Sequence, residues 1–153
     1  MNLKPIAVVT TALVACWFSV VHELHAADVA RPNIIFLLTD DQRFDTLGAM
    51  GNPIIQTPNL DRLAAGGVLF RNSFATTSIC ATSRASYLTG QYARRNGVHD
   101  FRTTLSPEAF ANTYPMLLRA NGYRTAFVGK WGVGGELPKE DFDYWDGFAG
   151  QGR

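Results

Sequence analysis

The chain has 153 residues, of which 46% are apolar and 18% are charged, and this composition is typical of a globular protein and not of a disordered one. The 14 basic and 13 acidic residues leave a net charge of +1, which indicates no nucleic-acid partner. The sequence contains no internal repeat, so a solenoid is excluded and the length suits one modest domain.

Residues 1–26 have the pattern of a secretory signal. Lys4 provides the positive start, residues 6–21 are uncharged and mostly apolar, and Ala26-Ala27 offers a small-residue cleavage site. The apolar stretch covers 16 residues, fewer than the roughly 20 that span a bilayer, which disfavours an uncleaved anchor. The run Leu13-Val14-Ala15-Cys16 leaves a second option open, because it resembles a bacterial lipobox with Cys16 as the lipidated residue. We expect export to the periplasm or the extracellular space, with residues 27–153 as the mature part.

Cleavage near Ala26 would leave one cysteine in the mature chain. The sequence has two cysteines, and Cys16 lies inside the signal. In an exported protein, Cys80 would then have no intrachain disulfide partner. It is either a small buried apolar side chain or a reactive group, and its neighbours decide between these readings.

The first half of the mature chain predicts a strand, a helix and a second strand. Residues 33–39 (NIIFLLT) are apolar on both faces, which favours a buried parallel strand. Thr57 as N-cap and Pro58 at the first helical position begin a helix that Gly66-Gly67 ends. Residues 68–74 (VLFRNSF) alternate enough to predict another strand.

The second half continues with helices at residues 83–89 and 114–121, which Gly90 and Gly122 close. A third strand is predicted over residues 123–128.

This alternation predicts an α/β fold with a mostly parallel sheet flanked by helices. In such sheets, functional groups gather at the carboxyl ends of the strands. Asp40, Asp41 and Lys130 each follow a predicted strand, so we expect them at one edge. Beyond Lys130 the chain is rich in glycine and aromatic residues and reaches Arg153 without a closing element, so we expect the incomplete N-terminal part of a longer domain.

Three groups of residues are candidates for chemistry. Asp40-Asp41 suits either a solvated turn or a hard cation such as calcium or magnesium. Cys80 lies four residues before Arg84 at the entry to a helix, where backbone amides and a guanidinium favour an anion. Lys130 is either a solvated lysine or a group that neutralises a tetrahedral oxyanion.

Four blocks of the sequence together resemble the N-terminal region of the sulfatase family, which has an alkaline-phosphatase-like fold. The blocks are residues 33–41, the helix start at Thr57-Pro58-Asn59-Leu60-Asp61, residues 80–90 and residues 122–131. Each block alone is a weak signal, whereas the four in this order and spacing are specific.

The resemblance implies a role for each candidate residue. A formylglycine-generating enzyme would convert Cys80 to formylglycine, an aldehyde whose hydrate attacks the sulfur of a sulfate ester. Asp40, Asp41 and residue 80 would bind a divalent cation, normally Ca²⁺. Arg84 would position and stabilise residue 80, and Lys130 would hold the sulfate or the leaving oxygen. The implied substrate is a sulfated glycan or a small sulfate ester.

Two positions depart from the family pattern. Thr82 stands where the modification core Cys-x-Pro-x-Arg has proline, or sometimes alanine, which affects recognition by the modifying enzyme. Gly132 stands where the family commonly has histidine, so that contact with the leaving group is missing or comes from elsewhere. His99 is a candidate for it, although a structural role for His99 is the stronger expectation.

Two other functions stay open. A phosphodiesterase or phosphonate hydrolase of the same superfamily would use a similar site, although the Cys-x-x-x-Arg block favours a sulfatase. The second alternative is an inactive or binding-only fragment from a truncated gene. The resemblance implies further metal ligands in a later part of the family's sequence, and residues 1–153 do not include that part. Three acidic residues follow Lys130 too closely to replace them and are expected in surface turns: Asp141, Asp143 and Asp146.

Overall fold

The computed structural model describes residues 31–150. The predicted signal sequence of residues 1–26 and its lipobox Cys16 lie outside the described residues. The described residues divide into two units, residues 31–38 and residues 39–150.

The strand predicted over residues 33–39 is wrong, because the structure has no strand there. Ile35 and Leu37 expose 83% and 73% of their surface. An apolar run favours burial, but a strand forms only where a neighbouring backbone completes its hydrogen-bond ladder. Among residues 31–150 the ladder joins two later segments instead.

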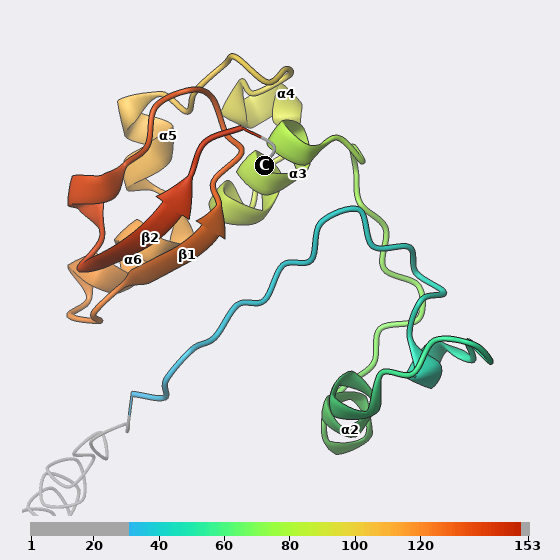
Figure 1. Ribbon diagram of the computed structural model, residues 1–153. Helices are drawn as coiled ribbons and strands as arrows, with labels where there is room; N and C mark the ends of the chain where they lie inside the picture. The colour runs from blue at the N-terminus through green and yellow to red at the C-terminus, as the bar shows by residue number, and fades with distance from the viewer. Residues whose placement is uncertain (1–30, 151–153) are drawn as a thin grey trace, which may run out of the picture. The chain divides into compact units, whose positions relative to one another are not determined.

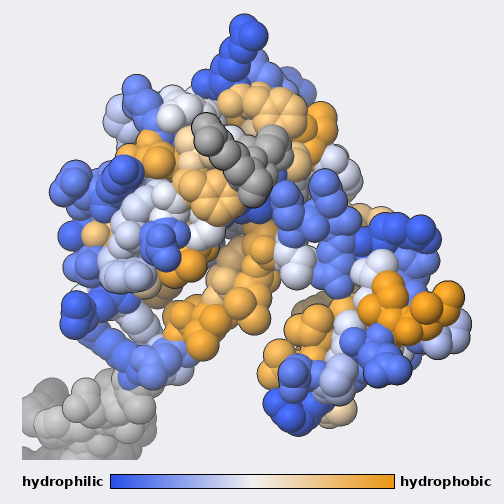
Figure 2. All heavy atoms as spheres, viewed as in Figure 1, coloured by the Kyte–Doolittle hydropathy of each residue, from blue (hydrophilic) through white to orange (hydrophobic). Residues whose placement is uncertain are grey.

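The strand predicted over residues 68–74 is also wrong. This segment contains a turn at residues 71–72 and no strand. Val68 and Phe70 are exposed, so no sheet covers the apolar face that their alternation suggested. Figure 2 shows such hydrophobic side chains at the surface of the part of the chain that carries helix α2.

The three predicted helices form. They are α2 (Pro58–Gly66), α3 (Cys80–Thr89) and α6 (Tyr114–Ala120). Helix α3 begins three residues earlier than predicted, so Cys80 is its first residue, and Gly90 ends it as expected. The shorter elements are η2 (Gly48–Met50), α4 (Ala93–Asn96), α5 (Pro107–Ala111) and η3 (Lys139–Asp141).

Thr57 precedes α2 but does not cap it with its side chain, which corrects the prediction. Its hydroxyl instead accepts from the amide of Gly48 and donates to Asp61, each at 2.9 Å. The carboxylate of Asp61 also accepts from the amide of Ala49 at 2.7 Å. These bonds fasten η2 to the first turn of α2.

The sheet among the described residues has two parallel strands, β1 (Ala126–Lys130) and β2 (Tyr144–Phe148), with Lys130 opposite Phe148 (Figure 1). Strand β1 lies later than predicted, so Lys130 is its last residue and does not follow it. The expected surface turn at Asp146 is wrong, because Asp146 lies within β2. Parallel pairing beside helices is the predicted α/β architecture, in incomplete form.

The core lies between one face of this sheet and the helices. Phe127 of β1 stacks on Trp145 of β2 with ring centroids 4.7 Å apart, and Trp131 meets Phe127 edge-on at 5.3 Å. The buried apolar residues are Ala81, Ala85, Leu88, Val98, Trp131, Val133 and Phe142. Helix α3 supplies three of them, so its orientation is set by burial, and with it the position of Cys80 and Arg84. In the described part of the chain, no helix is long and apolar enough to cross a membrane.

Candidate active site

The structure brings together the five site residues that the sequence singled out. Asp40, Asp41 and Cys80 each offer one potential ligand atom, and these atoms lie within 4.8 Å of one another. Arg84 and Lys130 reach the same place, because both contact the carboxylate of Asp40. Asp40 is therefore the residue that the candidate cation site and the two basic side chains share.

Local structure explains how each side chain arrives there. Cys80 is the first residue of α3, and Arg84 follows one helical turn later, which places both on one face of the helix. Lys130 ends β1, and the amide of the next residue, Trp131, still donates to the carbonyl of Phe148 in β2 at 3.0 Å. Asp41 has a left-handed backbone with φ of 51°, a conformation that aspartate tolerates better than most residues.

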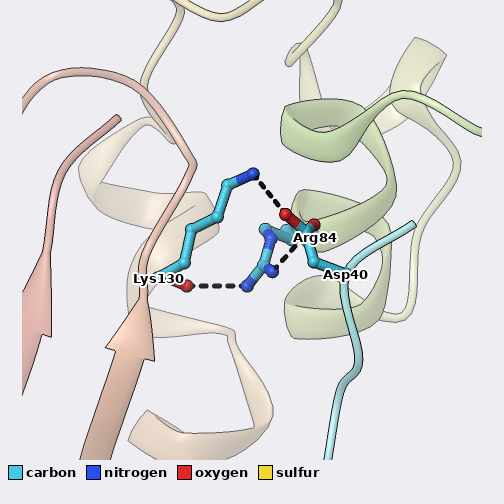
Figure 3. Close-up of polar contacts among 3 residues, drawn as sticks. All are labelled: Asp40, Arg84 and Lys130. Atoms are coloured by element: carbon cyan, nitrogen blue, oxygen red, sulfur yellow. Dashed lines mark hydrogen bonds and ion pairs between the residues drawn. The ribbon is translucent and has the colours of Figure 1, made fainter. Parts of the chain in front are cut away.

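The three charged groups form one network (Figure 3). The ammonium of Lys130 donates to Oδ2 of Asp40 at 2.8 Å. The guanidinium of Arg84 donates through Nη2 to Oδ1 of Asp40 at 3.3 Å and through Nη1 to the backbone carbonyl of Lys130 at 2.6 Å. Arg84 thus ties α3 to the end of β1 while it contacts the carboxylate.

The network is electrostatically asymmetric. The side chains of Arg84 and Lys130 are only 12% and 7% exposed, whereas that of Asp40 is 45% exposed. The hydrogen bond from Lys130, together with that from Arg84, holds the pKa of Asp40 below its usual value of 3.8, although partial desolvation opposes this. Asp40 therefore stays ionised and compensates two mostly buried positive charges.

The donor set suits a hard divalent cation in part. Two carboxylates supply the charged oxygen atoms that calcium and magnesium prefer. The thiol of Cys80 is a softer ligand that these cations do not favour. An oxygen-bearing residue 80, as formylglycine would be, makes the group uniformly oxygen-donating. Asp40, Asp41 and residue 80 therefore fit the implied cation best when residue 80 is modified.

The start of α3 adds backbone donors to the site. The amide of Ser83 donates to the carbonyl of Ile79 at 2.8 Å, so the amides of residues 80–82 precede the first turn of the helical ladder. Such amides favour an anion at this end of the helix. The hydroxyl of Thr82 is buried and has no hydrogen-bond partner among the described residues.

The remaining candidates do not join the site. His99 is exposed and is not in the candidate metal group of the described residues. Asp143 serves the fold instead, because its carboxylate accepts from the amide of Thr125 at 2.7 Å and pairs with Arg119 at 3.8 Å. The amide hydrogen bond from Thr125 lowers the pKa of Asp143.

Sequence reasoning missed one part of the site, the backbone carbonyl of Lys130. This acceptor lies 46 residues from Arg84 along the chain. Residue type cannot identify it, because every residue carries a backbone carbonyl.

Comparison with known proteins relates the chain to one family. The family profile described as Sulfatase matches residues 32–151. An N-acetylglucosamine-6-O-sulfatase of Bacteroides thetaiotaomicron is 40% identical over 124 residues, which are 81% of this chain and 22% of the relative. Human steryl-sulfatase is 40% identical over 73% of this chain and 20% of its own. An ulvan-active sulfatase of Formosa agariphila is 36% identical over 94% of this chain and 29% of its own.

A solved structure also matches. It is described as a complex with its substrate D-glucosamine-2-N,6-O-disulfate, and it superposes with a TM-score of 0.68 at 41% identity. The match covers 75% of this chain and 22% of that chain. The present chain thus spans between a fifth and a third of the length of these relatives.

Proposed function

Because this chain belongs to the sulfatase family, we propose that it provides the nucleophile segment and part of the metal site of a sulfuric ester hydrolase. One observation carries the proposal. Asp40 lies with Asp41 and Cys80 in a possible cation site and simultaneously contacts Arg84 and Lys130, so groups for metal and for sulfate meet at one carboxylate.

Residue 80 is the proposed nucleophile after conversion of Cys80 to formylglycine. Residue 80 is the first residue of α3. The amides of residues 80–82 precede the helical ladder there and favour the negative charge of a sulfate group. A divalent cation, normally Ca²⁺ in this family, would be held by Asp40, Asp41 and residue 80, and would supply charge neutralisation and favour an ionised oxygen nucleophile.

The two basic residues have separate proposed tasks. Arg84 holds the carboxylate of Asp40 and the end of β1 in fixed positions next to residue 80. Lys130 carries a compact positive charge beside Asp40 and is the proposed contact for the sulfate or the leaving oxygen. Both donors are oriented before substrate binds, so little reorganisation accompanies the development of charge.

The proposed substrates are sulfated sugars. Two of the similar proteins are described with sulfated amino sugars, one as a sulfatase of N-acetylglucosamine and one in complex with glucosamine disulfate. The proposed substrate class rests on these relatives.

Because this chain supplies only part of the proposed metal site, the test measures sulfate release by a protein that joins it to the later part of the domain, after co-expression with a formylglycine-generating enzyme. N-acetylglucosamine 6-sulfate and an aryl sulfate should be hydrolysed with Ca²⁺ present, and an aryl phosphate much more slowly. Cys80→Ala should abolish turnover, whereas Ser78→Ala, a change at an exposed neighbour, should not. Faster hydrolysis of the phosphate would favour the related phosphodiesterase or phosphonate hydrolase activity. Full turnover by Cys80→Ala would refute the assignment of the nucleophile.

We also propose that the protein is exported. The support is the sequence of residues 1–26, with its positive start, apolar stretch and small residues near Ala26. Signal cleavage can be tested by N-terminal sequencing of protein from the periplasm or the medium, and retention of residues 1–26 in a cytoplasmic product would contradict it.

A further inference from the structure

A basic and aromatic segment follows helix α3, outside the network at Asp40. Residues 92–102 contain three arginines and one aspartate, a net charge of +2 in a chain whose total is +1. Figure 2 shows strongly hydrophilic side chains over α4 and the loop that follows it. The three arginines are exposed, and the phenylalanine of the segment exposes 54% of its surface. These four side chains form the basic–aromatic surface: Arg94, Arg95, Phe101 and Arg102.

The positive charges of this surface are available to a ligand. None of its three arginines forms an ion pair with a carboxylate of residues 31–150. Asp100, the acidic residue of the segment, directs Oδ1 into its own turn, where it accepts from the amides of Arg102 and Thr103 at 2.9 and 2.7 Å. Burial of an unpaired arginine is costly, so we expect these side chains to stay at the surface of a longer protein as well.

The backbone on both sides of Phe101 is fixed. Val98 is fully buried, and its amide donates to Oδ1 of Asn96 at 2.9 Å. Asn96 is itself only 5% exposed, which anchors the end of α4. After Phe101, the hydroxyl of Thr103 donates to Oδ1 of Asp100 at 2.8 Å and closes the turn. A ligand that binds here therefore has little backbone to order.

The turn of residues 100–103 adjoins the loop that leaves the candidate active site. A Cβ atom built on Gly134 would lie 3.0 Å from Cα of Thr104, so the backbones of these two residues are in direct contact. Gly134 comes four residues after Lys130, and the intervening Val133 is 1% exposed and holds the loop against the core. One extended ligand can therefore contact the turn and the site together.

An anionic saccharide suits this combination of groups. A guanidinium binds a sulfate or a carboxylate through two parallel N–H donors. An exposed aromatic ring offers an apolar face against which the C–H groups of a pyranose ring can pack. Nucleic acid fits less well, because its affinity depends on the neutralisation of many phosphates and the segment carries a net charge of only +2.

We propose that the basic–aromatic surface binds a sugar unit of a sulfated glycan next to the unit whose sulfate is cleaved. Phe101 packs against the ring of that sugar, and the arginines bind its acidic groups. The choice of ligand rests on the proposed sulfatase function, which supplies the substrate class. Phe101 and Arg102 are then specificity-determining residues, because they favour a saccharide chain over a simple sulfate ester.

Calorimetric titration with a heparin tetrasaccharide, a short chain of sulfated sugars, tests the arginines. The parent protein joins this chain to the later part of the domain and carries Cys80→Ala, so that no sulfate is cleaved. Arg102→Gln should weaken binding about fivefold, the strength of one exposed ion pair, and Arg94→Gln/Arg102→Gln on the order of twentyfold. Arg124→Gln is the matched control, because Arg124 is exposed and precedes β1, at the strand end opposite Lys130. It should bind like the parent protein.

Two results of this titration would overturn the proposal. The first is equal affinity of Arg102→Gln and Arg124→Gln for the tetrasaccharide. The second is a parent protein that does not bind the tetrasaccharide.

The aromatic part of the surface has its own pair of variants. Phe101→Leu keeps an apolar side chain but removes the flat ring, so it should weaken tetrasaccharide binding roughly fivefold. Phe101→Tyr keeps the ring and should bind like the parent protein. Polyglutamate with the same number of charges is the control ligand. If it binds as tightly as the tetrasaccharide, or if Phe101→Leu binds like the parent, the surface recognises charge alone and the proposal is wrong. Tighter binding of a thymidine oligonucleotide of equal charge would also overturn it.

Steady-state kinetics separates this proposal from the proposed function. In the joined protein with a modified residue 80, Arg102→Gln should lower kcat/KM for a 6-sulfated glucosamine disaccharide about fivefold relative to that for an aryl sulfate, through a higher KM for the disaccharide. A protein that binds the tetrasaccharide through these residues but hydrolyses no sulfate ester would count against the proposed function and support the binding surface. An unchanged ratio of the two kcat/KM values in Arg102→Gln would overturn the role of the surface in specificity.

Discussion

Replacement of Lys130 by methionine is expected to raise the affinity of the protein for Ca²⁺. The two oxygen atoms of Asp40 face the ammonium of Lys130 at 2.8 Å and the guanidinium of Arg84 at 3.3 Å. A cation bound at this carboxylate shares it with two positive charges. Methionine keeps most of the apolar stem of Lys130 in its mostly buried position and removes only the charge and its hydrogen bond.

The size of the effect follows from the exposure of the pair. Asp40 is 45% exposed, so solvent screens its attraction to Lys130. The net free energy of the Asp40–Lys130 ion pair then lies near the upper end of the range for exposed pairs, about 1 kcal/mol. It is smaller than the several kcal/mol of a fully buried pair. Removal of a competing interaction of about 1 kcal/mol corresponds to a roughly fivefold decrease in the dissociation constant for Ca²⁺.

Calorimetric titration with Ca²⁺ at constant ionic strength measures this change directly. Lys139→Met is the matched control, because it removes the same charge from an exposed position in η3. We expect Lys130→Met to bind about five times more tightly and Lys139→Met to bind like the wild-type protein. Equal or weaker binding by Lys130→Met would show that its ammonium does not compete for Asp40.

Three further predictions concern other residues. Asp41→Asn should weaken Ca²⁺ binding by on the order of a few kcal/mol, because a charged ligand is lost, and unchanged affinity by calorimetry would remove Asp41 from the metal site. Asp143 has a pKa below 3.8 because it accepts the amide of Thr125, so it stabilises the fold above pH 3.8 and this contribution disappears as the pH falls through the lowered pKa. The urea midpoint of Asp143→Asn should therefore approach that of the wild type below pH 3.8, and a constant difference down to pH 2 would contradict the reasoning. Thr82→Pro should leave α3 intact, because position 82 lies in the first turn, where no intrahelical hydrogen bond is lost. It should increase the conversion of Cys80 to formylglycine, as judged from the mass of the peptide that ends at Arg84. Equal conversion in both proteins would show that Thr82 is not the departure that limits modification.

Local features were predictable from the sequence because neighbouring residues determine them. Proline at the first turn of α2 and glycine after α3 act through their own backbone preferences, and both helices form where these residues indicated. The candidate site residues were also predictable, because Asp40, Cys80 and Lys130 belong to short blocks whose order and spacing resemble one family. Their catalytic and metal-binding roles stay predictions.

Strand formation and the contacts within the site depended on tertiary structure. Residues 33–39 and 68–74 have strand-like patterns but form no hydrogen-bond ladder. Strand β2 pairs with β1 although its five residues include one aspartate and one glycine beside three aromatic residues. A strand requires a partner that its own pattern does not specify.

The network at Asp40 has the same origin. Its bonds join residues 44 and 90 positions apart, and that of Arg84 to the carbonyl of Lys130 joins residues 46 positions apart. Side-chain types identified which charges were available, but only the packing of α3 against the end of β1 decided that Arg84 would contact a backbone carbonyl and pass beside Gly132. Such contacts depend on the relative positions of elements to within fractions of an ångström, which packing of the buried core sets and residue spacing does not.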